Sequence, residues 1–390
     1  MKKLLSLALA LLLLAVMLPV VSMADEIAWE GSNNVYWQAG NDSGQTATLA
    51  DALKAAYMAN NGDITITCRP GSNVGSLTHG HVADNITIIG NGAYISGGEC
   101  DLEVDTFMFS RDTGSQVKSG GAYLDKDITI TASNLYNLGV WGQRNTNYTV
   151  NINLTNCDSK EISGEVNVQR VYISGTTGVN NITVTDCDFL TKATALYSNA
   201  DGTVVIDNCT FKGGQVPVNF NHKADGKQTV AVKNSTFTNC GDEGEWSAFA
   251  APVRFVNSGT GSLDATIENN TFTGTVGNNG DILLGDYRDG ETSNDFTATI
   301  TPNGTTKVRN SGITDEPTPI TGKVTADAKG NITHVKEEGP TTIVIISPTQ
   351  DTPKTDDQKN PTTGANDLVA VAVAAAALAL AGSAIILRKD

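Results

Sequence analysis

The chain has 390 residues, of which 42 are Asp or Glu and 26 are Lys or Arg, so its formal net charge is -16. This excess of acid argues against nucleic acid and anionic lipid as partners, because both are negatively charged. A hydrophobic fraction of 39% excludes a disordered chain, and 39 Gly residues indicate a β-rich protein with many turns.

The first 24 residues have the pattern of a secretory signal peptide. Lys2 and Lys3 precede an apolar run that begins at Leu4, and a small residue, Ala24, ends the segment. A basic start, an apolar middle and a small-residue cleavage site are typical of signal peptides. We therefore expect export and a mature chain that begins at Asp25; an uncleaved N-terminal anchor is the alternative.

An amphipathic helix is predicted shortly after this segment. Its apolar residues recur at helical spacing and form one stripe: Leu49, Ala52, Leu53, Ala56 and Tyr57. Thr48 is the expected N-cap, Asp51 lies in the first turn, and Asn61-Gly62 should end the helix. Such a helix is suited to cover the open apolar end of a stack of repeats.

A repeated pattern follows the helix. Each copy is an alternating strand, then Asn or Asp, a small residue, a spacer and usually Phe. The copies occupy 85–92, 127–135, 149–157, 181–189, 203–211, 229–237 and 264–272. Apolar residues recur at every second position, which excludes helical repeats, and a period of roughly 20–50 residues indicates a solenoid.

Strand geometry predicts how the copies stack. Ile182 and Val184 should face inward and Thr183 and Thr185 outward, with neighbouring rungs about 4.8 Å apart. One Asn or Asp per rung then falls at a tight corner, where its side chain can bond to the next rung: Asn156, Asp186, Asn208, Asn234 and Asn269. One Phe per rung should form an inner column: Phe189, Phe211, Phe237 and Phe272.

This arrangement resembles the right-handed parallel β-helix of the pectate-lyase-like superfamily over about residues 45–300. The resemblance implies an all-β solenoid domain at 25–300 with an N-terminal capping helix. It does not fix a function, because one fold supports many activities.

The cysteines divide into two groups. Cys157, Cys187 and Cys209 share one repeat position, so they should stack inward as buried free thiols. Cys68 and Cys100 are a candidate disulfide pair near the cap, and the state of Cys240 is open.

Signals for metal binding and catalysis are weak. His79 and His81 have the spacing of half a metal site, but their Gly-rich surroundings favour solvated loop residues, so we predict no metal ligands. The candidate acids are Asp186, Asp188, Asp281, Asp286 and Asp289. The β-helix lyases that the repeats resemble use Asp/Glu-bound Ca²⁺ and an Arg base, so Ca²⁺ is the cofactor to expect only if the chain is a lyase; otherwise none is expected.

A second strand in each repeat suggests a binding surface. Its inward residues should be Val140, Val171, Leu196, Val218 and Phe255. The outward positions next to them form what we call the strip: Trp141, Arg170, Tyr172, Tyr197, Asn219, Asn221 and Arg254. Rings can lie against sugars and Arg can pair with carboxylates, which favours an acidic glycan. The alternative is that these are ordinary exposed strand residues.

The C-terminal part contains four further segments. Residues 301–346 should form a small β cap or module, and 347–363 lack apolar residues and should be an extended linker. Residues 368–387 are apolar and uncharged, which predicts a transmembrane helix, and 388–390 would be a cytoplasmic basic tail.

The motif Asn-Pro-Thr-Thr-Gly at 360–364 lies between the linker and the apolar run. Together with the apolar run and basic tail it resembles a sortase sorting signal of Gram-positive surface proteins, although the common form begins with Leu. The resemblance implies cleavage between Thr363 and Gly364 and attachment of Thr363 to peptidoglycan. A simple membrane tether is the alternative.

Three functions remain open from the sequence. The first is a wall-anchored β-helix protein on the surface of a Gram-positive bacterium that binds host, matrix or glycan ligands, such as an acidic polysaccharide, as an adhesin does. The second is a tethered polysaccharide lyase or glycoside hydrolase, and the third is a passive spacer. We expect a monomer whose partners include sortase and peptidoglycan.

Overall fold

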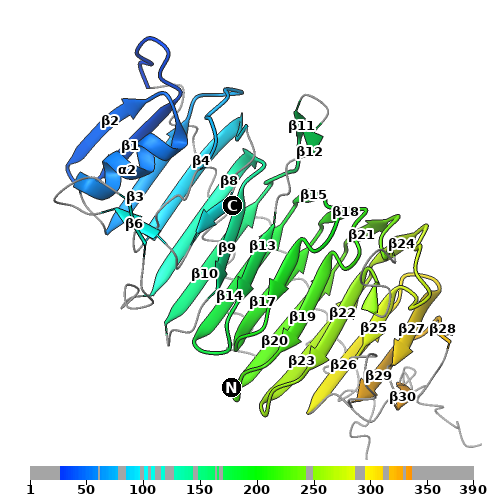
Figure 1. Ribbon diagram of the computed structural model, residues 1–390. Helices are drawn as coiled ribbons and strands as arrows, with labels where there is room; N and C mark the ends of the chain where they lie inside the picture. The colour runs from blue at the N-terminus through cyan, green and yellow to red at the C-terminus, as the bar shows by residue number, and fades with distance from the viewer. Residues whose placement is uncertain are drawn as a thin grey trace, which may run out of the picture. The chain divides into compact units, whose positions relative to one another are not determined.

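The computed structural model describes residues 27–59, 62–77, 85–96, 101–103, 107–109, 116–118, 127–143, 148–162, 165–166, 170–242, 249–285, 295–310, 316–327 and 331–335. The chain divides into two units, Met1–Lys336 and Glu337–Asp390, and the described residues all belong to the first. This part is mostly β with long parallel sheets (Figure 1), so the prediction of an all-β, solenoid-like fold is confirmed.

Within the described residues, the first sheet has 13 strands. In spatial order they are β2 (Asp42–Thr46), β1 (Val35–Ala39), β3 (Asp63–Cys68), β4 (Asn85–Tyr94), β8 (Ile128–Tyr136), β10 (Thr149–Thr155), β14 (Val179–Thr185), β17 (Gly202–Asp207), β20 (Lys227–Lys233), β23 (Ser262–Glu268), β26 (Phe296–Thr301), β29 (Val324–Asp327) and β30 (Ile332–His334). Pairing is parallel from β3 to β26.

The second sheet contains β28 (Thr318–Ile320), β27 (Thr306–Asn310), β25 (Ile282–Leu284), β22 (Val253–Asn257), β19 (Val218–His222), β16 (Leu196–Ser198), β13 (Val171–Ser174), β9 (Gly139–Gln143) and β5 (Asp101–Glu103). The third contains β15 (Asp188–Leu190), β18 (Thr210–Lys212), β21 (Thr236–Thr238) and β24 (Thr271–Thr273). Two short hairpins are separate: β6 (Phe107–Phe109) with β7 (Gln116–Lys118), and β11 (Glu161–Ile162) with β12 (Glu165–Val166).

Each full rung passes through the three sheets in turn. After β14 of the first sheet the chain enters β15 of the third and β16 of the second, and β17 then returns to the first sheet beside β14. The register pairs Ile152 with Ile182, and Ile182 with Val204. These inward residues are buried, so the apolar faces of successive rungs form one continuous core.

The corner between the first and third sheets holds the predicted Asn and Asp positions. All five have positive φ: 51° at Asn156, 55° at Asp186, 52° at Asn208, 50° at Asn234 and 56° at Asn269. Asn208 Nδ2 donates to Asp186 Oδ1 at 2.6 Å, and Asn156 Nδ2 donates to the side-chain oxygen of Asn134 one rung earlier. The corner is thus made of left-handed residues whose side chains link rungs.

The predicted inner column of phenylalanines is confirmed. Phe211 stacks on Phe189 and on Phe237, with ring centroids 5.1 and 4.8 Å apart, and Phe272 continues the column at 5.0 Å. The first three rings are fully buried, while Phe272 at the end of the third sheet is partly buried. The column therefore fills the interior behind the third sheet.

The stacked cysteines are buried free thiols, as predicted. The N–H of Cys157 donates to Cys187 Sγ at 3.3 Å, and the N–H of Cys209 donates in the same way to Ser235 Oγ at 3.1 Å. Hydrogen bonds with Cys157 and Cys209, together with burial, raise the pKa of Cys187. These side chains thus also serve as acceptors for buried amides. Cys68 and Cys240 are buried free thiols too, and Cys100 lies outside the described residues.

The N-terminal end is closed by the predicted helix, α2 (Leu49–Ala59). The N–H of Asp51 donates to Thr48 Oγ1 at 3.1 Å, which confirms Thr48 as the N-cap. A hairpin that the sequence did not reveal, β1–β2, pairs antiparallel with β3. Helix and hairpin together cover the first rung.

At the other end, parallel stacking continues past residue 300, because β27 pairs in parallel with β25. Strands β28, β29 and β30 then add antiparallel pairs to the last strands. Among the described residues, no helix is long and apolar enough to span a membrane. The predicted signal peptide, the linker, the sorting motif, the run at 368–387 and the basic tail lie outside the described part, as do His79 and His81.

Candidate functional site

The strip follows the outer face of the second sheet. The register places Trp141 beside Tyr172, Tyr172 beside Tyr197, Tyr197 beside Asn219, and Asn219 beside Arg254. Asn221 lies two positions from Asn219 on β19, so alternation puts it on the same face; Arg170 lies immediately before β13 and acts electrostatically on Tyr172. The structure therefore brings six of the seven sequence-selected residues onto one face of one sheet, with Arg170 next to it at the start of β13.

The same row of outward-facing positions continues over two more strands that the sequence analysis did not include. Leu283 on β25 pairs with Arg254, and Arg309 on β27 pairs with Leu283. The strands around these residues are short and lack the Asn-plus-Phe signature. The segment Ile282–Leu284 is apolar throughout, so its sequence does not mark Leu283 as outward-facing; the register with Arg254 does.

The first half of the strip is aromatic and half-buried: Trp141, Tyr172 and Tyr197. The rings of Tyr172 and Tyr197 are stacked, with centroids 4.5 Å apart and planes 12° from parallel. Burial raises the pKa of Tyr197 to about 12 and also raises that of Tyr172, and the nearby Arg170 opposes the second shift. Both phenols therefore stay protonated at neutral pH and remain hydrogen-bond donors.

The second half of the strip is polar and buried. Asn219, Asn221 and Arg254 are 6%, 8% and 3% exposed, so the strip is not open along its whole length. Arg254 Nη1 donates to Asn219 Oδ1 at 2.9 Å, and the guanidinium lies 4.9 Å from the ring centroid of Phe249. Here the side chains hold the segment before β22 against the sheet.

A second arginine has a similar structural role. Arg309 is 6% exposed, and its Nη1 donates to Asn279 Oδ1 at 2.6 Å. Asn279 Nδ2 in turn donates to the carbonyl oxygen of Ala250 at 3.0 Å. Arg254 and Arg309 thus connect the sheet with the segments that precede β22 and β25, which leaves the aromatic half as the accessible part of the strip.

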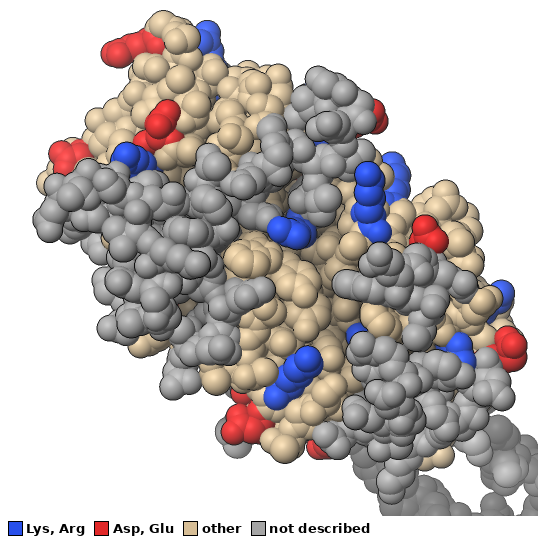
Figure 2. All heavy atoms as spheres, in the orientation of Figure 1, with Lys and Arg blue, Asp and Glu red and all other residues tan. Residues whose placement is uncertain are grey.

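One face of the molecule has a largely uncharged centre, although the chain as a whole is acidic. Figure 2 shows this face. Its central part is mostly uncharged and carries a few basic side chains, whereas most acidic side chains lie toward the rim. An anionic ligand would meet less repulsion at such a centre than at the rim.

The three candidate catalytic acids that the structure describes are not brought together. Asp186 is one of the corner residues, and Asp188 begins β15 on the third sheet. Asp281 lies before β25; its oxygens accept hydrogen bonds from Thr275 Oγ1 at 2.6 Å and the N–H of Lys307 at 2.8 Å. Asp286 and Asp289 lie outside the described residues. Within the described part, no three His, Cys, Asp or Glu side chains are grouped as metal ligands would be.

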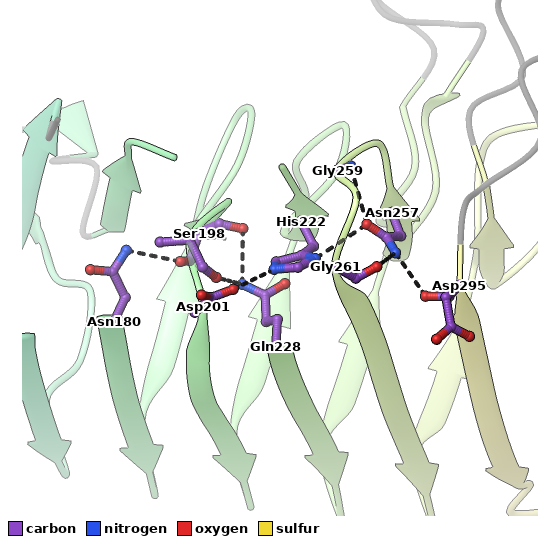
Figure 3. Close-up of polar contacts among 10 residues, drawn as sticks. Asn180, Ser198, Asp201, His222, Gln228, Asn257, Gly259, Gly261 and Asp295 are labelled. Atoms are coloured by element: carbon purple, nitrogen blue, oxygen red, sulfur yellow. Dashed lines mark hydrogen bonds and ion pairs between the residues drawn. The ribbon is translucent and has the colours of Figure 1, made fainter. Parts of the chain in front are cut away.

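A buried polar cluster at the corner between the second and first sheets was not found from the sequence (Figure 3). His222 is fully buried; its Nε2 lies 2.8 Å from Asp201 Oδ1 and its Nδ1 lies 3.2 Å from Asn257 Oδ1. The inward parity shared by Val218, Phe220 and His222 was the sequence signal that would have revealed it.

The amide of Asn257 determines where the hydrogens lie. Its Nδ2 donates to the carbonyl oxygens of Gly261 and Asp295, each at 2.7 Å, and its Oδ1 accepts the N–H of Gly259 at 3.2 Å. His222 Nδ1 must therefore carry a hydrogen to bond to Oδ1. A further hydrogen must lie on Nε2 or on the Asp201 carboxyl, since two acceptors cannot bond to each other.

The cluster continues along the corner. Gln228 Nε2 donates to the carbonyl oxygen of Ala200 at 2.8 Å, and Asn180 Nδ2 donates to Ser198 Oγ at 3.1 Å. Gln228, Asn180 and Ser198 are buried as completely as His222. With no access to solvent at His222, the His222–Asp201 pair is suited to holding rungs together and not to acid–base catalysis on a bound substrate.

Comparisons with known proteins give no assignment: no family model matches the chain, and no curated protein or solved structure is significantly similar to it.

Proposed function

We propose that this protein is an exported surface protein whose rungs form a right-handed, pectate-lyase-like parallel β-helix, and that it binds an acidic glycan at the aromatic half of the strip. The observation that carries the proposal is the stacked pair Tyr172 and Tyr197, flanked by Arg170 on an otherwise acidic chain. The sequence resemblance to sortase substrates supports attachment of Thr363 to peptidoglycan.

The stacking determines how a sugar would bind. Because Tyr172 and Tyr197 face each other across the rungs, they turn ring edges and hydroxyl groups outward more than ring faces. Protonated phenols donate hydrogen bonds to hydroxyl or carboxylate oxygens, and a guanidinium pairs with a carboxylate. A uronate-containing chain offers both kinds of acceptor, which is why an acidic glycan fits better than a neutral one here.

Binding of the purified full-length chain to an array of uronate-rich and neutral glycans tests this proposal. The double variant Tyr172→Ala, Tyr197→Ala should lose about tenfold or more in affinity for uronate-rich chains, and Trp141→Ala should lose less. The matched control is Tyr94→Ala, Tyr136→Ala, a second pair of tyrosines in register on β4 and β8. Unchanged binding by the first variant would exclude the strip as the site.

Product analysis separates binding from catalysis. The same glycans are incubated with the protein in the presence and absence of Ca²⁺. Unsaturated products or new reducing ends would establish a lyase or hydrolase in place of a binding protein.

Attachment is tested on wall fragments by mass spectrometry. We expect the mature chain to end at Thr363 in covalent linkage to a peptidoglycan amine. A chain that still carries Gly364 and the apolar run would show a membrane tether instead.

A further inference from the structure

The outer face of the first sheet is a second, different surface. On four neighbouring strands, β4, β8, β10 and β14, three outward positions per strand align in register. We call these positions the hydroxyl–amide face: Asn85, Thr87, Ile89, Thr129, Thr131, Ser133, Asn151, Asn153, Thr155, Asn181, Thr183 and Thr185. All of them are exposed or half-buried, all but Ile89 carry a hydroxyl or an amide, and none is charged.

The absence of charge is local to these strands. On the same outer face, Asp63 lies on β3, Asp207 on β17, and Lys233 and Glu268 form a 3.4 Å ion pair on β20 and β23. The face is therefore a neutral patch between charged strands in a chain of which 17% of the residues are charged. A charged polymer would gain nothing at this face, whereas a neutral one would lose no solvated ion on binding.

Strand propensity does not account for the composition of the face. Threonine is favoured in strands, but asparagine is depleted there, and Asn151, Asn153 and Asn181 occupy mid-strand positions on two adjacent strands. Cross-rung hydrogen bonds account for Asn151 and Asn181, whereas Asn153 makes none with the other described residues.

Side chains of the face are held in place by one another. Asn181 Nδ2 donates to Asn151 Oδ1 at 3.0 Å, Asn151 Nδ2 lies 3.4 Å from Thr129 Oγ1, and the hydroxyl oxygens of Thr155 and Thr185 are 3.2 Å apart. Groups that are already ordered lose less conformational entropy when a ligand binds. Each of these groups also keeps further hydrogen-bonding capacity, because an amide or hydroxyl can make more than one bond.

The spacing of the groups suggests the shape of the ligand. Equivalent side chains repeat at about 4.8 Å from rung to rung and at about 6.6 Å along a strand. A sugar unit of an extended β-linked chain advances by a distance close to the rung spacing. Because alternate units of such a chain are turned over, a chain lying across the strands would repeat the same hydrogen bonds at every second rung.

We propose that the hydroxyl–amide face binds an extended, neutral, β-linked polysaccharide that runs across β4, β8, β10 and β14 with one sugar per rung. This surface lies on a different sheet from the strip and does not depend on the function proposed above. The ligand is neutral where the strip's ligand is acidic, so the two sites are separable by experiment.

Adsorption of the full-length chain to insoluble neutral glycans, namely cellulose, chitin and a linear β-1,3-glucan, tests the proposal. The variant Asn153→Lys, Thr183→Lys places two charges on adjacent strands of the face and should reduce the adsorbed fraction about tenfold. The matched control is Thr210→Lys, Thr236→Lys, which adds the same charges on adjacent strands of the third sheet. A milder variant, Asn153→Ala with Thr183→Ala, should reduce adsorption without adding charge. Thermal melts confirm that each variant folds.

The outcomes separate cleanly. Loss in both face variants with the control unchanged supports the proposal. No adsorption of the unmodified chain to any of the three glycans overturns it, as does an equal loss in the control, or equal adsorption to ice or bare silica. Tyr172→Ala with Tyr197→Ala should leave this adsorption intact, and the face variants should leave uronate binding intact, so failure of one proposal is distinguishable from failure of the other.

Discussion

Asparagine at the corner of each rung reconciles a sharp bend with close stacking. A non-Gly residue with positive φ is strained because Cβ approaches the backbone carbonyl, and Asn tolerates this best because its amide bonds locally. At Asn208 that amide also bonds to Asp186 of the preceding rung. One residue therefore both turns the chain and fixes the spacing of two rungs.

Substitution at Asn208 separates these two contributions. Both Asn208→Ala and Asn208→Gly remove the bond to Asp186, but only Ala keeps the strain of φ 52°. We expect Ala to lower the free energy of unfolding by about 1 kcal/mol more than Gly does. Urea denaturation measures this difference, and equal losses would show that the backbone is not strained there.

The buried histidine gives a second prediction. His222→Phe fits an apolar ring into the corner but removes the Nδ1–H that Asn257 Oδ1 accepts and the Nε2 atom that bonds to Asp201. Asn257 is buried, so loss of this donor to its Oδ1 should cost about 1–3 kcal/mol of stability, whereas the partly exposed Asp201 can be solvated. His334→Phe, at an exposed position on β30, is the control and should be nearly neutral by the same urea assay.

The contribution of Tyr197 in the strip to folding stability depends on pH. The pKa of Tyr197 is raised to about 12 by burial, so the folded state keeps this proton while an unfolded tyrosine loses it near its usual value of about 10. Stability from this residue is therefore complete below about pH 10 and decreases as pH rises toward 12. The tyrosinate absorbance that distinguishes the unmodified chain from Tyr197→Phe should appear only near pH 12. Its appearance near pH 10 would show that the ring is solvated.

At the scale of elements, neighbouring strands are joined by side chains that repeat from rung to rung. The phenylalanine column stacks behind the third sheet. Directly after the corner residue, a cysteine, serine or asparagine side chain accepts a hydrogen bond from a buried backbone N–H. Short three-residue strands such as β18 have few backbone bonds of their own, so they depend on this packing.

Removal of a ring from the middle of the column tests that dependence. Phe211 is fully buried between two stacked rings, so Phe211→Ala should lower the free energy of unfolding by about 3–5 kcal/mol. Phe272→Ala, at the partly buried end of the column, should cost clearly less. Urea denaturation of both variants measures the contrast, and equal costs would contradict a continuous column.

At the scale of the whole β unit, the strands of each described rung pair with those of the rungs next to it. The stability of such a stack is close to a sum of rung and neighbour contributions, so a change at one end should stay local. The cap of α2 is therefore expected to protect the nearest strands and to have no effect on distant ones.

Hydrogen exchange shows how far a local change spreads. Thr48→Ala removes the N-cap bond of α2 and should cost about 1 kcal/mol. Amides of β1 and β3, which contact the helix, should exchange faster, while those of β20, β23 and β26 should not change. Faster exchange in all of these strands would mean that the unit unfolds as one cooperative block.

The rungs could be predicted from the sequence, because alternation, the corner Asn and the repeated Phe are local patterns that each rung must satisfy separately. The outward orientation of Trp141, Tyr172 and Tyr197 could also be predicted, because alternation along a strand shows which side chains point away from the core. What the sequence could not show is which outward residues are then covered. Asn219, Asn221 and Arg254 have the parity of exposed residues and yet are buried, because Phe249 before β22 packs on Arg254, and side chains of the next rung pack on Asn219 and Asn221. The cluster around His222 and the in-register hydroxyl–amide face likewise depend on which strands become neighbours, and only the tertiary structure decides that.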